Sequence, residues 1–421
     1  HVKAVEPAKI PLTLIILLFA IPFYNKANLW MLALATLLSA IAMVSEINPG
    51  SFLVRSINNA AFLGSFFGVL NMLRIASKTS PSVLRCGRML VTRPPGQRYL
   101  ALTFGALLFS VVLNFGALIL LGNMTRDANE QLDEPYQHIR DIRERRMLIA
   151  LLRGFNAALI SSPAAISFAV VLSLVPDTNW QALLPLAFAT SVIFVLLGWV
   201  HDRITYRPRA TRLAFDNSEN YSVVLPLFVV LFILLGAAAW VVSTFDSTLT
   251  EGVIFVLPFV AVAWLLVQHK GGLAQRVQKL GASVTHLLLV DQFNVRQELW
   301  FVMLLGFISG LIAALISAHA PDGGLLNIGD HPVLFIGMMM VTILGLGLAG
   351  LNPLLGVSLL GSLLPSPEAV GLTPLMMALT LLTAWGLAAG TCQGVAATHV
   401  IASVAKKSVA TVVFVWNGTF T

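Results

Sequence analysis

The stretch "LISSPAAISFAVVLSLVP", Leu159 to Pro176, interrupts an apolar run with two serines and a proline. A backbone break inside a lipid bilayer leaves N–H and C=O groups without partners. Each such group costs several kcal/mol unless protein, water or a bound solute satisfies it, so breaks persist where they line a cavity. If the surrounding chain lies in a membrane, this stretch predicts a polar site inside it.

The composition of the chain is that of a membrane protein. Of its 421 residues 57% are hydrophobic and 11% are charged, and the mean hydropathy is +0.86. Long apolar runs recur from Ile10 to Val415 with short polar connections, which favours helical spans over the alternating strands of an outer-membrane barrel. We expect an all-α polytopic membrane protein with about 9–11 transmembrane helices in two structural repeats.

The apolar runs place the individual spans. Simple spans are predicted over residues 10–24, 29–45, 52–73, 99–122, 181–200, 222–243, 253–268, 299–319 and 372–390. Regions 147–175 and 333–364 are longer than the roughly 20 residues that a span needs, and each carries a proline or glycine near its middle. Each is predicted to be a re-entrant hairpin of two half-helices. The charged segment 124–146 is predicted to be an interfacial helix.

Charge in the connections predicts how the protein is oriented. The net charge is +7, and loops 74–98 and 201–221 are rich in arginine, which predicts that both are cytoplasmic in a bacterial-type inner (plasma) membrane. This excess of positive charge does not indicate a nucleic-acid partner. The two cysteines, Cys86 and Cys392, have no disulfide or metal-ligand pattern, so neither redox chemistry nor a metal site is expected.

Two parts of the chain share a pattern of prolines. Prolines at 163, 176 and 185 have intervals of 13 and 9 residues, and prolines at 353, 365 and 374 have intervals of 12 and 9. The alternative is a chance recurrence, because membrane helices tolerate proline and serine. The repeat divides the chain into N-terminal helices and a basic loop for scaffold or oligomer contacts (1–95), a first repeat (96–200), linking helices with an amphipathic segment (201–295), a second repeat (296–405) and the start of a further apolar segment (406–421).

The hairpin tips supply the candidate site. Ser162-Pro163 and Asn352-Pro353 are each predicted to be an N-cap followed by the first helical residue, where half-helix dipoles favour anionic groups. The candidate substrate or ion site comprises Asn156, Ser161, Ser162, Pro163, Asn352, Pro353, Thr391, Gln393, Thr398 and His399. The alternative is ordinary helix capping without a ligand, with His399 a packed histidine. Arg153 either attracts an anion or extends to the membrane interface.

This arrangement of spans, hairpins and Ser-Pro or Asn-Pro tips resembles the ion transporter superfamily, which includes divalent anion/sodium symporters and arsenite permeases. The resemblance is architectural and covers residues 96–404. It implies inverted repeats, a membrane homodimer and an elevator-like movement of the hairpins. The Ser-Asn-Thr tips of the dicarboxylate symporters are absent, and the loop charges leave open whether the repeats here are inverted or parallel.

The sequence therefore predicts a secondary active transporter that moves a small anionic solute by alternating access. Coupling to Na⁺ or H⁺ is expected, because no nucleotide-binding GxxxxGK[ST] motif occurs, and no other cofactor is predicted. The expected partners are the lipid bilayer, the solute and a second copy of the chain. The alternative is a non-transporting scaffold subunit of a larger envelope complex. An intramembrane enzyme is not expected, because neither HExxH nor GxSxG occurs.

Overall fold

The computed structural model describes residues 6–45, 49–78, 80–130, 137–206, 221–269, 273–319, 331–418 and 420, and no β-strand occurs among them. The helices are α1 (Glu6–Ala20), α2 (Lys26–Val44), α3 (Pro49–Lys78), α4 (Pro81–Val91), α5 (Pro95–Leu113), α6 (Phe115–Glu130), α7 (Gln137–Ser161), α8 (Ile166–Leu174), α9 (Trp180–Thr205), α10 (Leu225–Phe245), α11 (Leu249–Gln268), α12 (Leu273–His286), α13 (Gln292–Asn294), α14 (Arg296–His319), α15 (Pro332–Leu348), α16 (Pro353–Leu363), α17 (Pro374–Thr391) and α18 (Ala396–Ala405). Short 3-10 or π-helical segments are η2 (Ile21–Phe23), η4 (Tyr221–Val224), η5 (Leu287–Asp291), η6 (Pro367–Val370) and η7 (Thr411–Trp416). The predicted all-α fold is confirmed.

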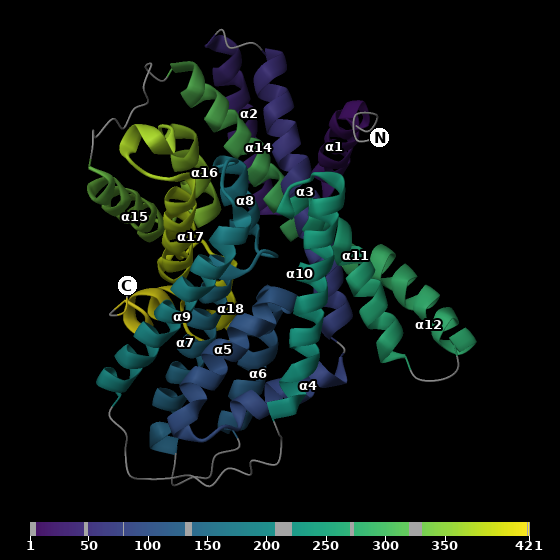
Figure 1. The fold of residues 1–421 in the computed structure, drawn as a ribbon, viewed down its shortest axis with the longest axis vertical. Helices are drawn as coiled ribbons and strands as arrows, with labels where there is room; N and C mark the ends of the chain where they lie inside the picture. Colours follow the sequence, from purple (N-terminus) through teal and green to yellow (C-terminus); the bar gives the residue numbers. More distant parts are fainter. Residues whose placement is uncertain are drawn as a thin grey trace.

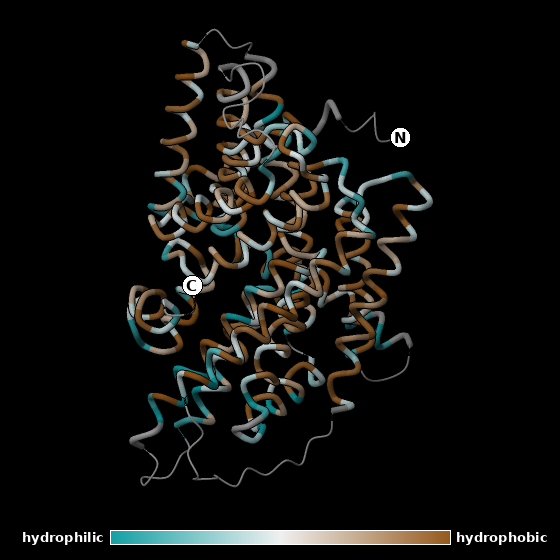
Figure 2. The backbone as a smooth tube through the Cα atoms, turned by 60° about the vertical axis from the view of Figure 1, so that its left-hand side comes forward, coloured by the Kyte–Doolittle hydropathy of each residue, from teal (hydrophilic) through white to brown (hydrophobic). Residues whose placement is uncertain are grey.

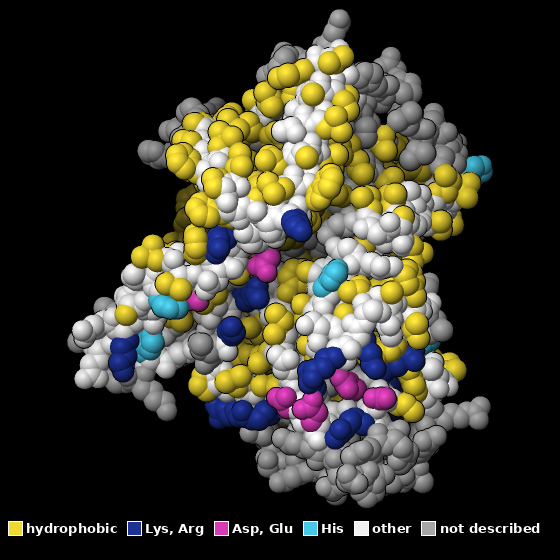
Figure 3. All heavy atoms as spheres, turned by 180° about the vertical axis from the view of Figure 1, so that it is seen from behind, with side chains coloured by type: hydrophobic (Ala, Val, Ile, Leu, Met, Phe, Trp, Pro, Cys, Tyr) yellow, Lys and Arg dark blue, Asp and Glu magenta, His cyan; other side chains and the backbone are white. Residues whose placement is uncertain are grey.

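Eight helices in the described part of the chain are long and apolar enough to cross a membrane. They are Lys26–Val44, Phe52–Lys78, Arg140–Leu174, Trp180–Thr205, Ser222–Phe245, Leu249–Gln268, Arg296–Leu315 and Pro374–Ala405, and shorter apolar helices cover Ile10–Phe23, Gln97–Leu113 and Pro332–Leu348. Hydrophobic residues recur along the helices in Figure 2. Charged side chains gather near one end of the face in Figure 3, and apolar side chains cover the other end. The chain is a multi-pass membrane protein.

The N-terminal helices pack with α14 on one side of the molecule (Figure 1). Gly306 and Gly310 of α14 lie against the backbone of Asn59 and Ser56 of α3. These small residues let the two helix backbones approach closely. Helices α10 and α11 pack on each other, and α11 also packs on α3.

The chain folds back on itself between α5 and α6. Gly105 of α5 lies against Leu90 of α4, and Met124 of α6 lies against Gly87 of the same helix. Both residues contact α4, and they lie at nearly equal distances along the chain before and after Asn114. Helices α5 and α6 therefore form a hairpin with its tip at Asn114. The span predicted over residues 99–122 is therefore interrupted.

Helices α15–α18 supply a second hairpin and a broken helix. Helices α15 and α16 fold into a hairpin with its tip at residues 349–352, whereas α17 and α18 belong to one membrane span that is interrupted at 392–395. The earlier pair α7 and α8 likewise belongs to one span, interrupted at 162–165.

The two hairpins and two broken helices make corresponding contacts. Helix α5 packs along α7 as α15 packs along α17. Helix α6 packs on α18 as α16 packs on α8, and the two broken helices cross each other through α7 and α17. The contacts thus relate α5–α8 to α15–α18 as two structural repeats.

This correspondence corrects the pairing that the proline intervals predict. Ser162-Pro163 does not correspond to Asn352-Pro353, because the first pair lies in a broken helix and the second at a hairpin tip. Region 147–175 is therefore not a re-entrant hairpin, whereas 333–364 is one. Segment 124–146 is not a separate interfacial helix either. It divides between the end of α6 and the start of α7, and residues 131–136 lie outside the described part.

Candidate functional site

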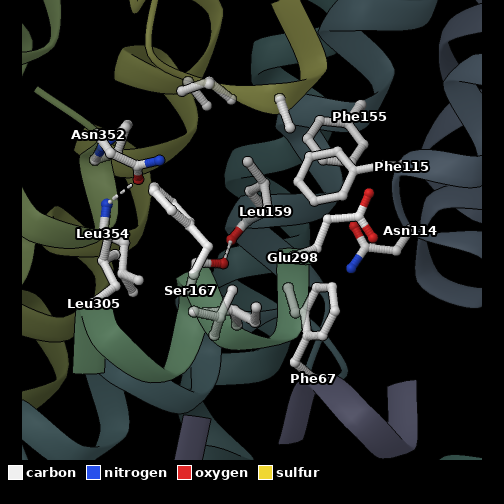
Figure 4. A pocket seen from close by; sticks show the side chains of 18 of the residues that line it. Phe67, Asn114, Phe115, Phe155, Leu159, Ser167, Glu298, Leu305, Asn352 and Leu354 are labelled. Carbon is white, nitrogen blue, oxygen red and sulfur yellow. Dashed lines mark hydrogen bonds between the residues drawn. The ribbon is translucent and has the colours of Figure 1, made fainter. Parts of the chain in front are cut away.

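A cavity of about 460 Å³ lies where the two repeats meet, and all four helix interruptions contribute to its wall. The hairpin tips contribute Asn114 and Asn352, and the broken helices contribute Ser162 and Val395. Figure 4 shows Asn114 and Asn352 on opposite sides of the space between them. Residues of α2, α3 and α14 line its remaining side.

The break in the first repeat follows from a proline. Pro163 has no N–H to donate to the carbonyl of Leu159, so α7 ends there. The hydroxyl of Ser167 donates to that carbonyl instead (Figure 4). The hydroxyl of Ser162 accepts a hydrogen bond from the N–H of Ala164 at 3.2 Å. Because α8 begins three residues after the proline, the prediction that Ser162 and Pro163 are its N-cap and first residue is wrong.

The break in the second repeat has the same conformation but a different sequence. Its first residue, Cys392, accepts a hydrogen bond on sulfur from the N–H of Gly394 at 3.2 Å, as Ser162 does on oxygen in the first break. Both breaks have a turn over their second and third residues. The hydroxyl of Thr398 donates to the carbonyl of Cys392 at 3.1 Å. Protein groups therefore satisfy part of the backbone that the break exposes.

The tip of the second hairpin is a tight, well-capped turn. Gly350 has a φ of 93°, and the N–H of Leu351 donates to the carbonyl of Leu346 at 2.9 Å, which completes a Schellman motif. The side chain of Asn352 then accepts from the N–H two residues later at 3.0 Å, and Pro353 is the first residue of α16. The predicted N-cap and first helical residue are confirmed for this tip.

This second tip is docked on the second break. The Asn352 side chain donates to the carbonyl of Gly394 at 3.3 Å. The thiol of Cys392 donates to the carbonyl of Leu351 at 3.2 Å. Hydrogen bonds in both directions thus join the hairpin α15–α16 to the broken helix α17–α18.

The tip of the first hairpin has no such docking contact. Asn114 has φ 50° and ψ −131°, a conformation that asparagine tolerates better than most residues. Within the described part of the chain its side chain makes no hydrogen bond to residues 162–165. Its amide lies beside the Glu298 carboxylate in the view of Figure 4. A strained residue on a cavity wall indicates a functional position.

One end of the cavity is polar. Arg74 of α3 and Glu298 of α14 are the charged side chains of its described wall. Next to them, the Asn28 side chain donates to Oε1 of Gln297 at 2.8 Å, and the backbone N–H of Asn25 donates to the same oxygen at 3.2 Å. This network joins the start of α2 to the start of α14 and so positions Glu298.

The rest of the wall is mostly apolar. Its aromatic members are Phe67, Phe115, Phe155, Phe301 and Trp385. The rings of Phe115 and Phe155 stack with their centroids 5.0 Å apart. A cavity with a few convergent polar groups and an otherwise apolar lining is typical of a small-molecule site.

The sequence-predicted site residues do not all meet at this cavity. Those that line it are Ser162, Asn352 and Pro353. Those that are buried but do not line it are Asn156, Ser161, Pro163, Thr391 and Thr398, and those that are exposed away from it are Gln393 and His399. The prediction included residues of both breaks and of one hairpin tip, together with residues that do not line the cavity.

Arg153 is buried away from the cavity. Its guanidinium donates to the hydroxyl of Tyr99 at 3.0 Å, the carbonyl of Gly198 at 3.1 Å and the side-chain oxygen of Asn417 at 3.2 Å. It also lies 3.9 Å from the ring centroid of Phe420. These contacts connect α7 with α5, α9 and the C-terminal segment. They also occupy the Arg153 guanidinium, the group that the sequence suggests for attracting an anion.

Sequence reasoning missed Arg74, Asn114, Ser167 and Glu298. Ser167 lies within the opening stretch, and its spacing from Pro163 is the signal for a hydroxyl that replaces the missing N–H. Glu298 begins an apolar run in "VRQELWFVM", where a lone acid is costly and therefore indicates function. Asn114 carries no comparable signal.

No protein-family model matches the chain, and no curated protein matches its sequence. Among solved structures, the fold is similar to that of the YdaH transporter of Alcanivorax borkumensis, whose crystal structure is described as revealing an unusual topology. The two chains are 13% identical, the TM-score is 0.57, and the match covers 94% of this chain and 95% of that one. The likeness shows that this chain has a transporter-like membrane fold. Membership of the ion transporter superfamily stays a prediction.

Proposed function

We propose that the protein is a secondary active transporter that moves a small solute with an anionic group across the membrane by alternating access. The observation that carries the proposal is the convergence of four interrupted helices on one cavity. Interrupted helices in corresponding positions of two repeats are typical of the sites of secondary transporters. Arg74 supplies the positive charge at the cavity wall that an anionic group requires.

The two hairpins are the parts that we expect to move. The second hairpin is held to its neighbouring break by Asn352 and Cys392, whereas among the described residues no hydrogen bond joins the Asn114 side chain of the first hairpin to residues 162–165. When a cavity is closed at one gate only, we expect the hairpin at that gate to be docked and the other hairpin to be undocked. Coupling to Na⁺ or H⁺, an elevator-like displacement and a homodimer in the inner membrane belong to the same proposal.

Cysteine accessibility tests this proposal with neighbouring alanines as matched controls. Ala158 and Ala389 line the cavity, whereas Ala157 and Ala388 precede them on the same two helices and do not line it. We expect A158C and A389C, in a background without the native cysteines, to react with membrane-impermeant thiol reagents from both faces of oriented vesicles. A157C and A388C should remain unreactive.

The outcome separates transport from the scaffold function. Labelling of the cavity positions from both faces supports a site with alternating access. If neither cavity position reacts in folded protein, or if both react from one face only under every condition, the breaks are structural caps and the transport proposal fails.

A further inference from the structure

Two opposite charges face the cavity without binding each other. Arg74 and Glu298 interact electrostatically, but they form no direct ion pair, and neither side chain makes a hydrogen bond within the described residues. The carbons and Nε of Arg74 lie against Gly116, two residues from the tip of the first hairpin. Both charges are therefore available to a bound solute.

The packing of α3 and α14 offsets the backbone positions of the two charged residues along the helix axes. These helices run antiparallel, with Gly310 against Ser56 and Gly306 against Asn59. The same register places Glu298 at the level of residue 68, six residues from Arg74, which corresponds to ~9 Å along the helix axis. Since the two side chains come from different levels of the helix pair and form no direct ion pair, a solute that carries both an anionic and a cationic group can contact both.

The surroundings make an incomplete match unfavourable. Charges facing an apolar, membrane-embedded cavity are costly unless they are paired. An anion that binds Arg74 alone leaves the carboxylate of Glu298 uncompensated, and a cation that binds Glu298 alone leaves the guanidinium uncompensated. Only a solute with both charges compensates both walls, and the aromatic lining accommodates an apolar group beyond them.

We propose that the cavity binds a zwitterion with an apolar side group, whose carboxylate contacts Arg74 and whose ammonium contacts Glu298. Asn114 lines the same cavity and supplies a further polar group to it. This inference rests on the proposed transport function and names its class of solute, of which the large neutral amino acids are the simplest members.

Three small molecules test each charge separately. L-phenylalanine carries both groups, 2-phenylethylamine lacks the carboxylate, and 3-phenylpropanoate lacks the ammonium. With the purified full chain in lipid nanodiscs, isothermal titration should show that L-phenylalanine binds about 10- to 100-fold more tightly than either analogue, the change expected for one lost charge-assisted hydrogen bond. L-leucine and L-tryptophan are measured beside it, so that the result does not depend on one side group.

Substitutions assign each charge to its partner. E298Q should reduce the preference for L-phenylalanine over 3-phenylpropanoate, and R74Q should reduce the preference over 2-phenylethylamine. The control R126Q/E130Q removes an ion pair of the same chemistry, at 2.8 Å, that lies outside the cavity, and should leave all affinities unchanged.

Any of three results would overturn this proposal. One is that no zwitterion binds the wild-type chain. The second is that both analogues bind as tightly as L-phenylalanine, and the third is that the two cavity variants keep the wild-type order of affinities. If A158C and A389C still react from both faces, the transport function stands and only the solute class is wrong.

Discussion

At the scale of single residues, one hydroxyl makes the first break possible. Pro163 frees the carbonyl of Leu159, and Ser167 satisfies it. We predict that Ser167→Ala lowers the free energy of unfolding by about 1 kcal/mol, because the part-buried carbonyl of Leu159 then loses its hydrogen bond. Thermal unfolding of the detergent-solubilised protein measures the change.

A second serine on the same helix provides the comparison. Ser173 is exposed and donates to the carbonyl of Val170 at 2.7 Å within α8. Ser173→Ala should change the unfolding temperature much less than Ser167→Ala does. Equal effects of the two substitutions would show that the Ser167 hydroxyl does not stabilise the break specifically.

At the scale of elements, the sequence predicts those interruptions that a proline marks. Pro163 and Pro353 reveal a broken helix and a hairpin, and the apolar runs place most spans. The tip at Asn114 escapes prediction because its break depends on the conformation of one residue inside an apolar run. The sequence does not predict the pairing of the repeats either. The two broken helices share a backbone conformation, but the position of Pro163 in the first is occupied by Gln393 in the second, so the prolines do not align them.

Docking of the second hairpin gives a prediction for this scale. Asn352→Ala removes both the cap of α16 and the bond to the carbonyl of Gly394. The tip should then separate from its break more often and expose the Cys392 thiol, which donates to the carbonyl of Leu351. We expect Cys392 to react with a maleimide several-fold faster in this variant, as measured by mass spectrometry of the intact chain.

Two internal references make that measurement specific. Burial raises the pKa of the Cys86 thiol to about 12, so little thiolate forms near neutral pH and this cysteine should stay unlabelled in both proteins. Asn179 caps α9 in the same manner as Asn352 caps α16, but none of its described hydrogen bonds involves Cys392. If Asn179→Ala accelerates the labelling of Cys392 equally, the effect is general loosening and not undocking.

At the scale of the whole molecule, the two repeats differ in the hydrogen bond that docks a hairpin tip on its break. The second repeat has this bond, and the correspondence between the repeats leads us to expect it in the first as well. Asn352 donates to Gly394 in the second repeat, and the corresponding residues in the first are Asn114 and Ala164. Both Asn114 and Ala164 line the cavity, yet no hydrogen bond joins their side chain and backbone in the described structure. The cavity therefore lies at the gate where this contact is open.

Closure of that gate is the counterpart of the docked hairpin, and it can be trapped. We predict that N114C/A164C, in a background without the native cysteines, forms a disulfide in the membrane under mild oxidation, because alternating access requires the first hairpin to dock as the second does. The cross-link should protect a third cysteine, A158C, from impermeant reagents applied at the face that the first hairpin guards, and reduction should restore labelling. N114C alone is the control for oxidation. A folded protein in which the pair never cross-links would mean that the first hairpin is static and that the cavity does not alternate through it.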